Sequence, residues 1–297
     1  MIPGSDDDVT VTAADKTLRR GLPSDLKSRI LAGILLAIVA GTLSWWGGWP
    51  FAALILSVAL AMSWEWGQVV RGGGAHITLG VHAISAVAAV TLSAMGLAAL
   101  GLATVLASAL VVFALELGGR SIVSSAGVLY TGLPAVALLW LRGDEPWGAM
   151  AILFLFATVV ATDTFAYISG RLIGGPKLWP AISPNKTWAG FLGGITAAAL
   201  TGLGFQIWLH ASPFVLPLMA LVLGIVSQGG DLAESALKRS FGVKDASDLI
   251  PGHGGFMDRA DGIVAAAVAG ALYALFAGPQ SPAAALLGSL PLLLRNR

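Results

Sequence analysis

Nine long apolar stretches follow one another along this chain, beginning near residue 30. An α-helix needs about 20 mostly apolar residues to cross a bilayer, because lipid offers the backbone no hydrogen-bond partner. Each stretch approaches that length. We therefore predict an all-α integral membrane protein with about nine transmembrane helices, over Ile30–Trp46, Pro50–Val70, Ile77–Met95, Leu97–Leu117, Ile122–Leu141, Trp147–Ile168, Trp188–Leu209, Phe214–Ala233 and Met257–Phe276.

Composition supports a membrane protein and excludes a water-soluble enzyme. Charged residues make up 11% of the chain, compared with about 25% in a typical soluble domain. We divide the chain into a polar cytoplasmic tail (1–29), a first group of membrane helices (30–145), a catalytic membrane region (146–278) and an apolar tail (279–297). Residues 282–294 are too few to cross the bilayer, and whether they enter it is left open.

Basic residues are unevenly divided between the two sides of the membrane. If the N-terminus is cytoplasmic, 14 of the 17 Lys and Arg residues lie inside, and only Arg142 lies clearly outside. An excess of Lys and Arg in the cytoplasmic loops predicts this orientation. No small-residue cleavage site clearly follows the first apolar stretch, so we expect that helix to remain in the mature protein.

Two cytoplasmic loops, 169–187 and 234–256, are the substantial polar segments after the tail, and we expect the catalytic chemistry there. The helix ends beside them carry carboxylates that the span lengths bring to one level. These carboxylates are Asp163, Asp231, Asp258 and Asp261. A charge at the edge of the hydrocarbon costs on the order of 2.5 to 3.5 kcal/mol, so it usually faces a partner, a cavity or an ion.

These four aspartates allow two interpretations. In one, structural ion pairs neutralise them. The available cations are Lys238, Arg239, Lys244 and Arg259. In the other, Mg²⁺ binds one or two carboxylates and completes its shell with water and substrate phosphates, which leaves the basic residues free to bind phosphate. The chain has no cysteine, so any metal must bind to oxygen or histidine ligands.

Glycines and small polar residues in both loops suit phosphate binding. In Pro251–Gly255, three glycines allow backbone N–H groups to approach phosphate oxygens, although such runs are often plain turns. The earlier loop combines Arg171 and Lys177 with the sequence Ser183–Thr187. Charged groups of this kind can hold phosphate, but cytoplasmic loops are rich in Lys and Arg in any case.

The segment from Ser235 to Asp261 resembles the signature of the phosphatidate cytidylyltransferases, the CDP-diacylglycerol synthases. It combines fixed charges and glycines over 27 consecutive residues. Gly230-Asp231-Leu232 and Ser183–Thr187 also look like elements of this family, and the resemblance covers about residues 147–276. Ala260 and Asp248 differ from the usual family residues, but neither difference removes a charged residue of the signature.

This resemblance implies that CMP is transferred from CTP to phosphatidic acid, giving CDP-diacylglycerol and pyrophosphate, with Mg²⁺ required. It also implies a protein embedded in the bacterial inner membrane, with its active site in the cytoplasm and no nucleic acid as partner. A second cation and a homodimer are left open.

The resemblance and the charge pattern together assign candidate roles. We expect Asp231 and Asp258 to bind the metal, with Asp261 and Asp163 as further ligands or supporting groups. The other catalytic candidates are Lys238, Arg239, Lys244, Asp245, His253 and Arg259. The substrate-binding candidates are Ser183, Asn185, Lys186, Thr187, Ser235, Gly254 and Gly255.

Two other functions would use the same membrane architecture. In a cation-coupled transporter the aspartates would form an ion path, but such sites lie near the middle of the bilayer and these carboxylates lie at one face. A lipid-binding scaffold would leave CTP and phosphatidate unconsumed. Glu65 and Glu116, in the predicted membrane helices, receive no role from the sequence.

Overall fold

The computed structural model describes residues 38–73, 76–116, 120–247, 249 and 254–288. All the elements named below belong to one unit, residues 40–297. The long helices are α3 (Gly48–Arg71), α4 (Ile77–Ala94), α5 (Ala98–Leu115), α6 (Ser121–Arg142), α7 (Gly148–Leu172), α8 (Trp188–Leu209), α9 (Val215–Ser240) and α10 (Met257–Ala277). The short elements are β1 (Lys177–Trp179), β2 (Ser183–Thr187) and α11 (Pro282–Leu286).

The eight long helices are each long and apolar enough to cross a membrane, which shows an integral membrane protein. They coincide with eight of the nine predicted spans. The first predicted span is helical over residues 38–46, and its earlier part, residues 30–37, lies outside the described residues. The C-terminal tail begins with the five-residue helix α11, and residues 289–297 also lie outside the described residues.

Two expectations about the loops need correction. The prediction of an all-α protein missed a short antiparallel hairpin, in which Lys177 pairs with Thr187 and Trp179 with Ser183. In addition, α9 does not end at Ala233 but continues to Ser240, so the polar loop that follows is shorter than predicted. Its last two turns carry polar side chains along one face, and a polar face outside the hydrocarbon is compatible with helix.

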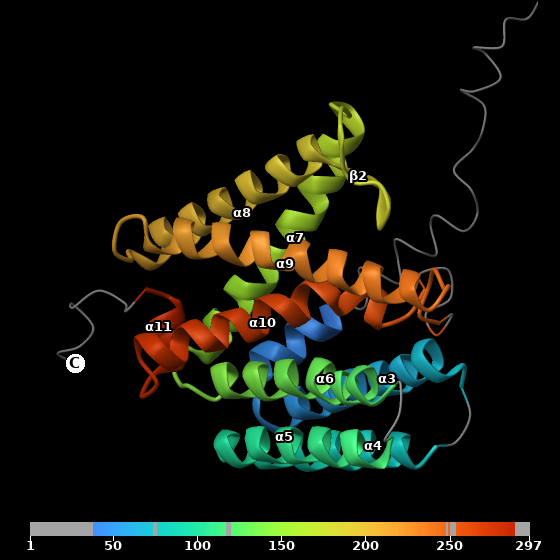
Figure 1. Ribbon diagram of the computed structural model, residues 1–297. Coiled ribbons are helices and arrows are strands. Elements are labelled where there is room, and N and C mark those ends of the chain that lie inside the picture. Colours follow the sequence, from blue (N-terminus) through green and yellow to red (C-terminus); the bar gives the residue numbers. More distant parts are fainter. Residues whose placement is uncertain (1–37, 74–75, 117–119, 248, 250–253, 289–297) are drawn as a thin grey trace, which may run out of the picture. The chain divides into compact units, whose positions relative to one another are not determined.

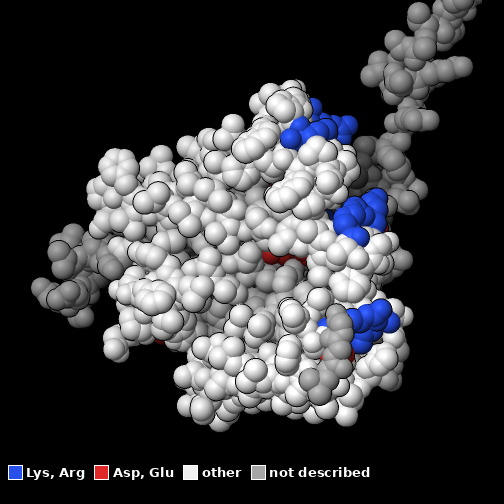
Figure 2. Space-filling model, in the orientation of Figure 1, with Lys and Arg blue, Asp and Glu red and all other residues white. Residues whose placement is uncertain are grey.

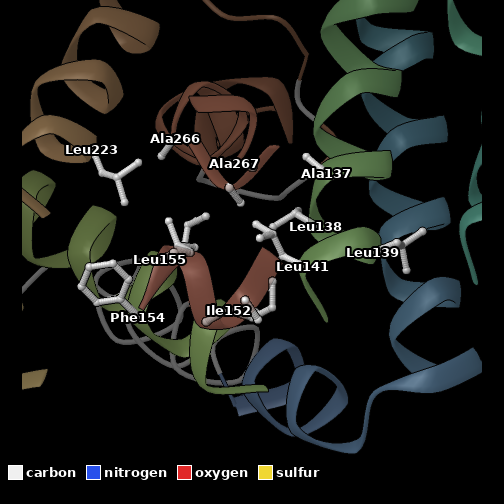
Figure 3. Close-up of a cluster of buried hydrophobic side chains, with 14 of the residues drawn as sticks. Ala137, Leu138, Leu139, Leu141, Ile152, Phe154, Leu155, Leu223, Ala266 and Ala267 are labelled. Carbon is white, nitrogen blue, oxygen red and sulfur yellow. The ribbon is translucent and has the colours of Figure 1, made fainter. Parts of the chain in front are cut away.

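Apolar packing joins the two halves of the bundle around α10. In Figure 1, α10 lies between α6 and α9, and it contacts both of them. Figure 3 shows Leu138 and Leu141 of α6 and Leu155 of α7 pointing toward Ala267 of α10. These four residues are buried in the main hydrophobic core. The small side chain of Ala267 lets the neighbouring helices approach closely, as is usual where membrane helices pack.

Basic side chains gather where one set of helix ends meets. Arg71, Arg171 and Lys238 lie in the last turns of α3, α7 and α9. Figure 2 shows Lys and Arg along one side of the visible face, with acidic atoms deep in a hollow beside them. Arg142 belongs to the other set of ends, where it donates hydrogen bonds to the carbonyl oxygens of Ser44 and Trp45.

A close contact between α7 and α8 positions the hairpin. A Cβ atom at Gly190 would lie 2.8 Å from the carbonyl oxygen of Ala166 and 3.4 Å from the Cα of Gly170, so the first turn of α8 rests directly on the backbone of α7. The hydroxyl of Thr187 accepts a hydrogen bond from the Gly190 N–H at 3.0 Å and caps α8. The hairpin is therefore held against the last turns of α7.

Candidate active site

A pocket of about 520 Å³ opens between the end of α7, the hairpin, the start of α8 and the later part of α9. The charged and polar side chains in its lining are Asp163, Tyr167, Arg171, Asn185, Lys186, Thr187, Gln228 and Asp231. Two carboxylates and two cations share this space, together with two amides, a phenol and the Thr187 hydroxyl. Such a mixture suits an anionic ligand that brings a cation with it, because each sign of charge in the ligand finds a partner.

Lys186 and Asp231 form the central ion pair of this pocket, with 2.5 Å between Lys186 Nζ and Asp231 Oδ2. Their side chains are 23% and 35% exposed, but the Lys186 ammonium itself is buried, where it faces Asp231. Lys186 also attracts Asp163, whereas Asp231 repels it. The hydroxyl of Ser235, one turn further along α9, donates to Asp231 Oδ1 at 3.4 Å. The pocket thus contains two carboxylates, Asp163 and Asp231, but only one lysine.

Tyr167 and Arg171 continue the pocket along α7, one and two turns after Asp163. Arg171 donates a hydrogen bond to the Tyr167 hydroxyl at 2.7 Å. Because both side chains are exposed, this contact orients the guanidinium without burying it. Arg171 can therefore offer its remaining N–H groups to phosphate oxygens, for which the planar guanidinium is well suited.

A second group of charges lies deeper between α9 and α10. Lys238 forms ion pairs with Glu234 of its own helix, at 2.7 Å, and with Asp258 at the start of α10. The other oxygen of Asp258 accepts hydrogen bonds from the backbone N–H groups of Gly255, at 2.9 Å, and Ala246, at 3.1 Å. Asp258 is thus fully engaged within the protein, as the structural ion-pair interpretation expects for this residue.

Asp261 lies close enough to both groups of charges to be repelled by carboxylates of each. It lies one turn after Asp258 on α10, and its charge is repelled by those of Asp231, Asp163 and Glu234. Its Oδ1 accepts a hydrogen bond from the Gly262 N–H at 2.7 Å. The structure therefore brings Asp163, Asp231 and Asp261 near one another, as the sequence predicted, and separates Asp258 from them by its pairing with Lys238.

These carboxylates fit an open metal site better than a closed one. Within the described residues, no three Asp, Glu or His side chains are arranged to hold a metal ion by themselves. Mg²⁺ does not need such a cage, because it usually takes one or two carboxylates and keeps water and phosphate oxygens as its other ligands. Asp231 and Asp163, which line one pocket, provide that donor set.

The remaining candidates lie around these two groups. Arg239, Lys244, Asp245 and Arg259 are exposed near the start of α10 and the end of α9, and Asn185 is exposed on β2. Ser183 pairs with Trp179 in the hairpin, and Gly254 precedes the buried Gly255. His253 and Asp248 lie outside the described residues. The substrate-binding and catalytic assignments of these residues stay predictions.

Sequence reasoning missed the most buried carboxylate of this region, Glu65 of α3, which is 0% exposed. It accepts hydrogen bonds from the Ser247 hydroxyl at 2.5 Å and from the backbone N–H groups of Phe256, at 2.9 Å, and Met257, at 2.7 Å. The available signal was a glutamate inside an apolar span, which usually has a specific partner. The other unassigned glutamate, Glu116, pairs with Arg71 at 3.4 Å.

Comparisons with known proteins show which family this chain resembles. The model of the cytidylyltransferase family matches residues 27–277. The phosphatidate cytidylyltransferase of Brucella melitensis biotype 1 is 43% identical over 266 residues, which cover 88% of this chain and 98% of that protein. The phosphatidate cytidylyltransferase of Staphylococcus epidermidis is 48% identical over 136 residues, 45% of this chain and 51% of that protein. Neither relative supports the transporter hypothesis.

Proposed function

Because the chain belongs to the cytidylyltransferase family, we propose that it transfers CMP from CTP to phosphatidic acid, giving CDP-diacylglycerol and pyrophosphate. One structural observation supports this reaction most directly. The pocket that contains Lys186, Arg171 and Asp231 lies at the polar ends of membrane-spanning helices. A lipid phosphate can reach such a place while its acyl chains stay in the bilayer, and a soluble nucleotide can reach it from water.

The basic ends of the helices support a cytoplasmic location for this pocket. Arg171 and Lys186 line it, and Arg71, Lys238 and Arg239 lie at the same set of helix ends. In an inner membrane, the positive-inside rule places these ends in the cytoplasm, where CTP is available. We therefore propose an inner-membrane enzyme whose active site faces the cytoplasm.

In the reaction, an oxygen of the phosphatidate phosphate attacks the α-phosphorus of CTP, and the bond from that phosphorus to the pyrophosphate oxygen breaks. Both reactants are anionic, so the protein must mainly align them and balance their charge. We assign Lys186 and Arg171 to phosphate binding, because both line the pocket and the Arg171 side chain is exposed there. Asn185 and Thr187, both on strand β2, line the side of the pocket that the hairpin forms.

Mg²⁺ is part of this proposal, with Asp231 and Asp163 as its protein ligands and Asp261 as a supporting carboxylate. When bound, the ion supplies positive charge to the phosphate oxygens. Support comes from the repulsion among these three carboxylates and from their hard oxygen donors. Asp258 is less suited to be a ligand, because Lys238 and two backbone N–H groups already occupy its oxygens.

The test is pyrophosphate release by the purified protein in lipid vesicles. We expect release only when CTP, phosphatidate and Mg²⁺ are all present. Diacylglycerol, which lacks the phosphate nucleophile, and ATP, which has another base, serve as matched substrate controls. Release that does not depend on phosphatidate would contradict the transfer reaction, and consumption of neither substrate with any divalent metal would support a transporter or a scaffold instead.

A further inference from the structure

The β1–β2 hairpin begins at the point where two membrane-spanning helices end. β1 starts at Lys177, shortly after α7 ends at Leu172, and β2 ends at Thr187, which caps α8. The Trp188 N–H, at the start of α8, donates a hydrogen bond to the carbonyl oxygen of Pro176 at 3.1 Å. This bond closes the base of the hairpin, which is therefore fixed to the ends of both helices.

The length of the hairpin limits how far Trp179 lies from the hydrocarbon. Lys177 pairs with Thr187 at the base, and Trp179 follows two residues later. A strand rises about 3.3 Å per residue, so Trp179 lies at most about 7 Å beyond the base. The headgroup region adds about 5 to 8 Å on each side of the hydrocarbon. Trp179 is therefore within the headgroup layer however the hairpin is tilted, whereas α9 runs past the hairpin on this side of the bundle in Figure 1.

The three side chains of β1, all of them described, point in two directions. Leu178 lines the pocket of the candidate active site, together with Arg171. Its neighbours Lys177 and Trp179 are exposed. Successive side chains of a strand point to opposite faces, so Lys177 and Trp179 lie on the side away from the pocket. β1 is therefore a wall, one strand thick, between the pocket and its surroundings.

Apolar side chains are exposed at the base of this wall. Leu172 and Ile173, at the end of α7, are 80% and 74% exposed, and Trp179 is 54% exposed. Ile173 also lines an apolar groove of about 760 Å³ between the spanning helices α7 and α8, with Phe165 and Leu192. The apolar surface of the spans thus continues through Ile173 to the hairpin. Such side chains are disfavoured in water, and an exposed tryptophan is typical of the interface between membrane and water.

Basic groups accompany these apolar side chains. Lys177 lies on the same side of β1 as Trp179, and Arg171 directly precedes Leu172 on α7. Among the described residues, neither cation forms an ion pair with a carboxylate. Anionic lipids attract basic residues that lie within a few ångströms of the membrane surface. Exposed apolar and unpaired basic side chains together therefore favour a layer of anionic phospholipid as the partner of this surface.

We infer that the outer face of the hairpin, formed by Leu172, Ile173, Lys177 and Trp179, docks in the headgroup layer and guides phosphatidate from the leaflet to Arg171. The identity of this lipid rests on the proposed function. Lys177 attracts the lipid phosphate outside the wall, and Arg171, which is exposed and lines the pocket, binds it inside. Trp179 keeps the wall at the depth of the phosphates, so the lipid reaches the pocket without leaving the leaflet.

The depth of the hairpin can be measured without turnover, because the chain has no cysteine and single cysteines can be labelled cleanly. Trp179→Cys and Ser240→Cys would carry a spin label in vesicles of phosphatidylcholine and phosphatidylglycerol. Ser240 is exposed at the end of α9, about 14 Å of helix beyond Asp231, and serves as the aqueous reference. We expect the label at 179 to collide more with oxygen, relative to a water-soluble nickel chelate, than the label at 240.

Two results of this measurement would overturn the inference. Equal collision ratios at 179 and 240 would place the hairpin in water. A label at 179 that is shielded from both oxygen and the nickel chelate would show that protein, rather than lipid, covers the outer face.

Kinetics test the guiding role. Lys177→Gln should raise the KM for long-chain phosphatidate in vesicles about fivefold, the effect of one basic residue at an anionic surface, and added salt should reduce this difference. Trp179→Ser should raise the same KM, and Trp179→Phe should restore it. The KM for CTP and the midpoint of thermal unfolding should not change. Trp45→Ser, which alters an exposed tryptophan at the opposite set of helix ends, is the control.

A short-chain phosphatidate that dissolves in water separates guiding from binding in the pocket. Because this substrate arrives from solution, its KM should be the same in Trp179→Ser and in the unaltered protein. Equal increases for the short-chain and long-chain substrates would show that Trp179 acts on the pocket itself, which overturns the inference. If the label at 179 lies in the headgroup layer but no substitution changes the KM for long-chain phosphatidate, the hairpin is only an anchor and the guiding role is wrong.

The same experiments keep this inference apart from the proposed function. If the unaltered protein releases no pyrophosphate from CTP with either phosphatidate, the proposed function fails, and the guiding role fails with it. The collision measurements do not depend on turnover, so they still decide whether the outer face docks in the headgroup layer.

Discussion

Two lysine–aspartate pairs in this protein have the same chemistry but different surroundings. Lys186 and Asp231 are 23% and 35% exposed and face a pocket, whereas Lys238 and Asp258 are 10% and 12% exposed. The buried pair has Glu234 as a third charge and two backbone N–H groups as further partners. In the exposed pair, Ser235 is a further partner of Asp231.

The difference in burial indicates which pair can take part in ligand binding. Ion pairs at a protein surface contribute only about 0 to 1 kcal/mol to stability, and the partly exposed Lys186–Asp231 pair is closer to that case than the Lys238–Asp258 pair. Breaking a buried pair leaves an uncompensated charge and costs about 3 to 5 kcal/mol. We therefore assign ligand binding to the Lys186 pair and a fixed architecture to the Lys238 pair. Four substitutions test this division.

The largest effect is expected from Lys238→Met, which leaves Glu234 and Asp258 without their shared cation. Stability should fall by about 3 to 5 kcal/mol, the range for a broken buried pair. Thermal unfolding in detergent would measure it, with Lys177→Met on the exposed strand β1 as a control. A Lys238 variant as stable as the Lys177 variant would remove the distinction between the two pairs.

Asp231→Asn should lower kcat/KM about 100-fold, as expected when one charged group is lost from a preorganised site. Its stability should fall by less than that of the Lys238 variant, because the Asp231 side chain is 35% exposed and water can replace part of the lost contact. Pyrophosphate release and thermal unfolding are measured on the same preparation. Glu145→Gln, an exposed carboxylate paired with Arg142, is the control. Unaltered activity in Asp231→Asn would move the metal site elsewhere.

Arg171→Ala should raise the KM for phosphatidate about tenfold, the value of one charge-assisted contact to phosphate. Tyr167→Phe removes only the hydroxyl that orients Arg171 and should have a smaller effect in the same direction. Steady-state kinetics with vesicles of graded phosphatidate content would measure both, and Arg120→Ala controls for lost surface charge. If the KM for CTP rises instead, Arg171 binds the nucleotide.

The smallest effect is expected from Thr187→Ala, which removes the cap of α8 beside the exposed pair. Loss of an N-cap hydroxyl costs about 1 kcal/mol of stability. Thr187→Ser should restore the cap and therefore both stability and activity. If Thr187→Ser recovers stability but not activity, Thr187 also contacts a substrate, as its assignment as a substrate-binding residue predicts.

Most of the fold follows from the sequence, because membrane helices are local structures. Length and apolarity alone decide whether a segment such as 98–115 can cross a bilayer, and the eight described spans overlap their predicted positions, although α9 continues past Ala233 to Ser240. The hairpin at Lys177–Thr187 was not predicted. Its strands are three and five residues long, and such short segments carry almost no periodic signal.

The sequence predicts which charged residues lie near the candidate site better than it predicts which of them form ion pairs with one another. Span lengths predicted Asp163, Asp231, Asp258 and Asp261 at one level, but not that Asp258 pairs with Lys238. The partner of Asp231 was not predicted, because Lys186 comes from the hairpin and the choice between Lys186 and Lys238 depends on how α9 faces each neighbour. Glu65 was unassigned for the same reason, since its partners Ser247, Phe256 and Met257 are more than 180 residues away.

Membrane spans, the positions of charges along each helix and the family signature can therefore all be found in the sequence. Which charges meet, and how deeply each pair is buried, depends on how the helices pack. The physical reason is that crossing a bilayer is decided within one segment of about 20 residues. The strength of an ion pair depends instead on its exposure to water and on its hydrogen-bond partners, and both are set by the helices that pack around it.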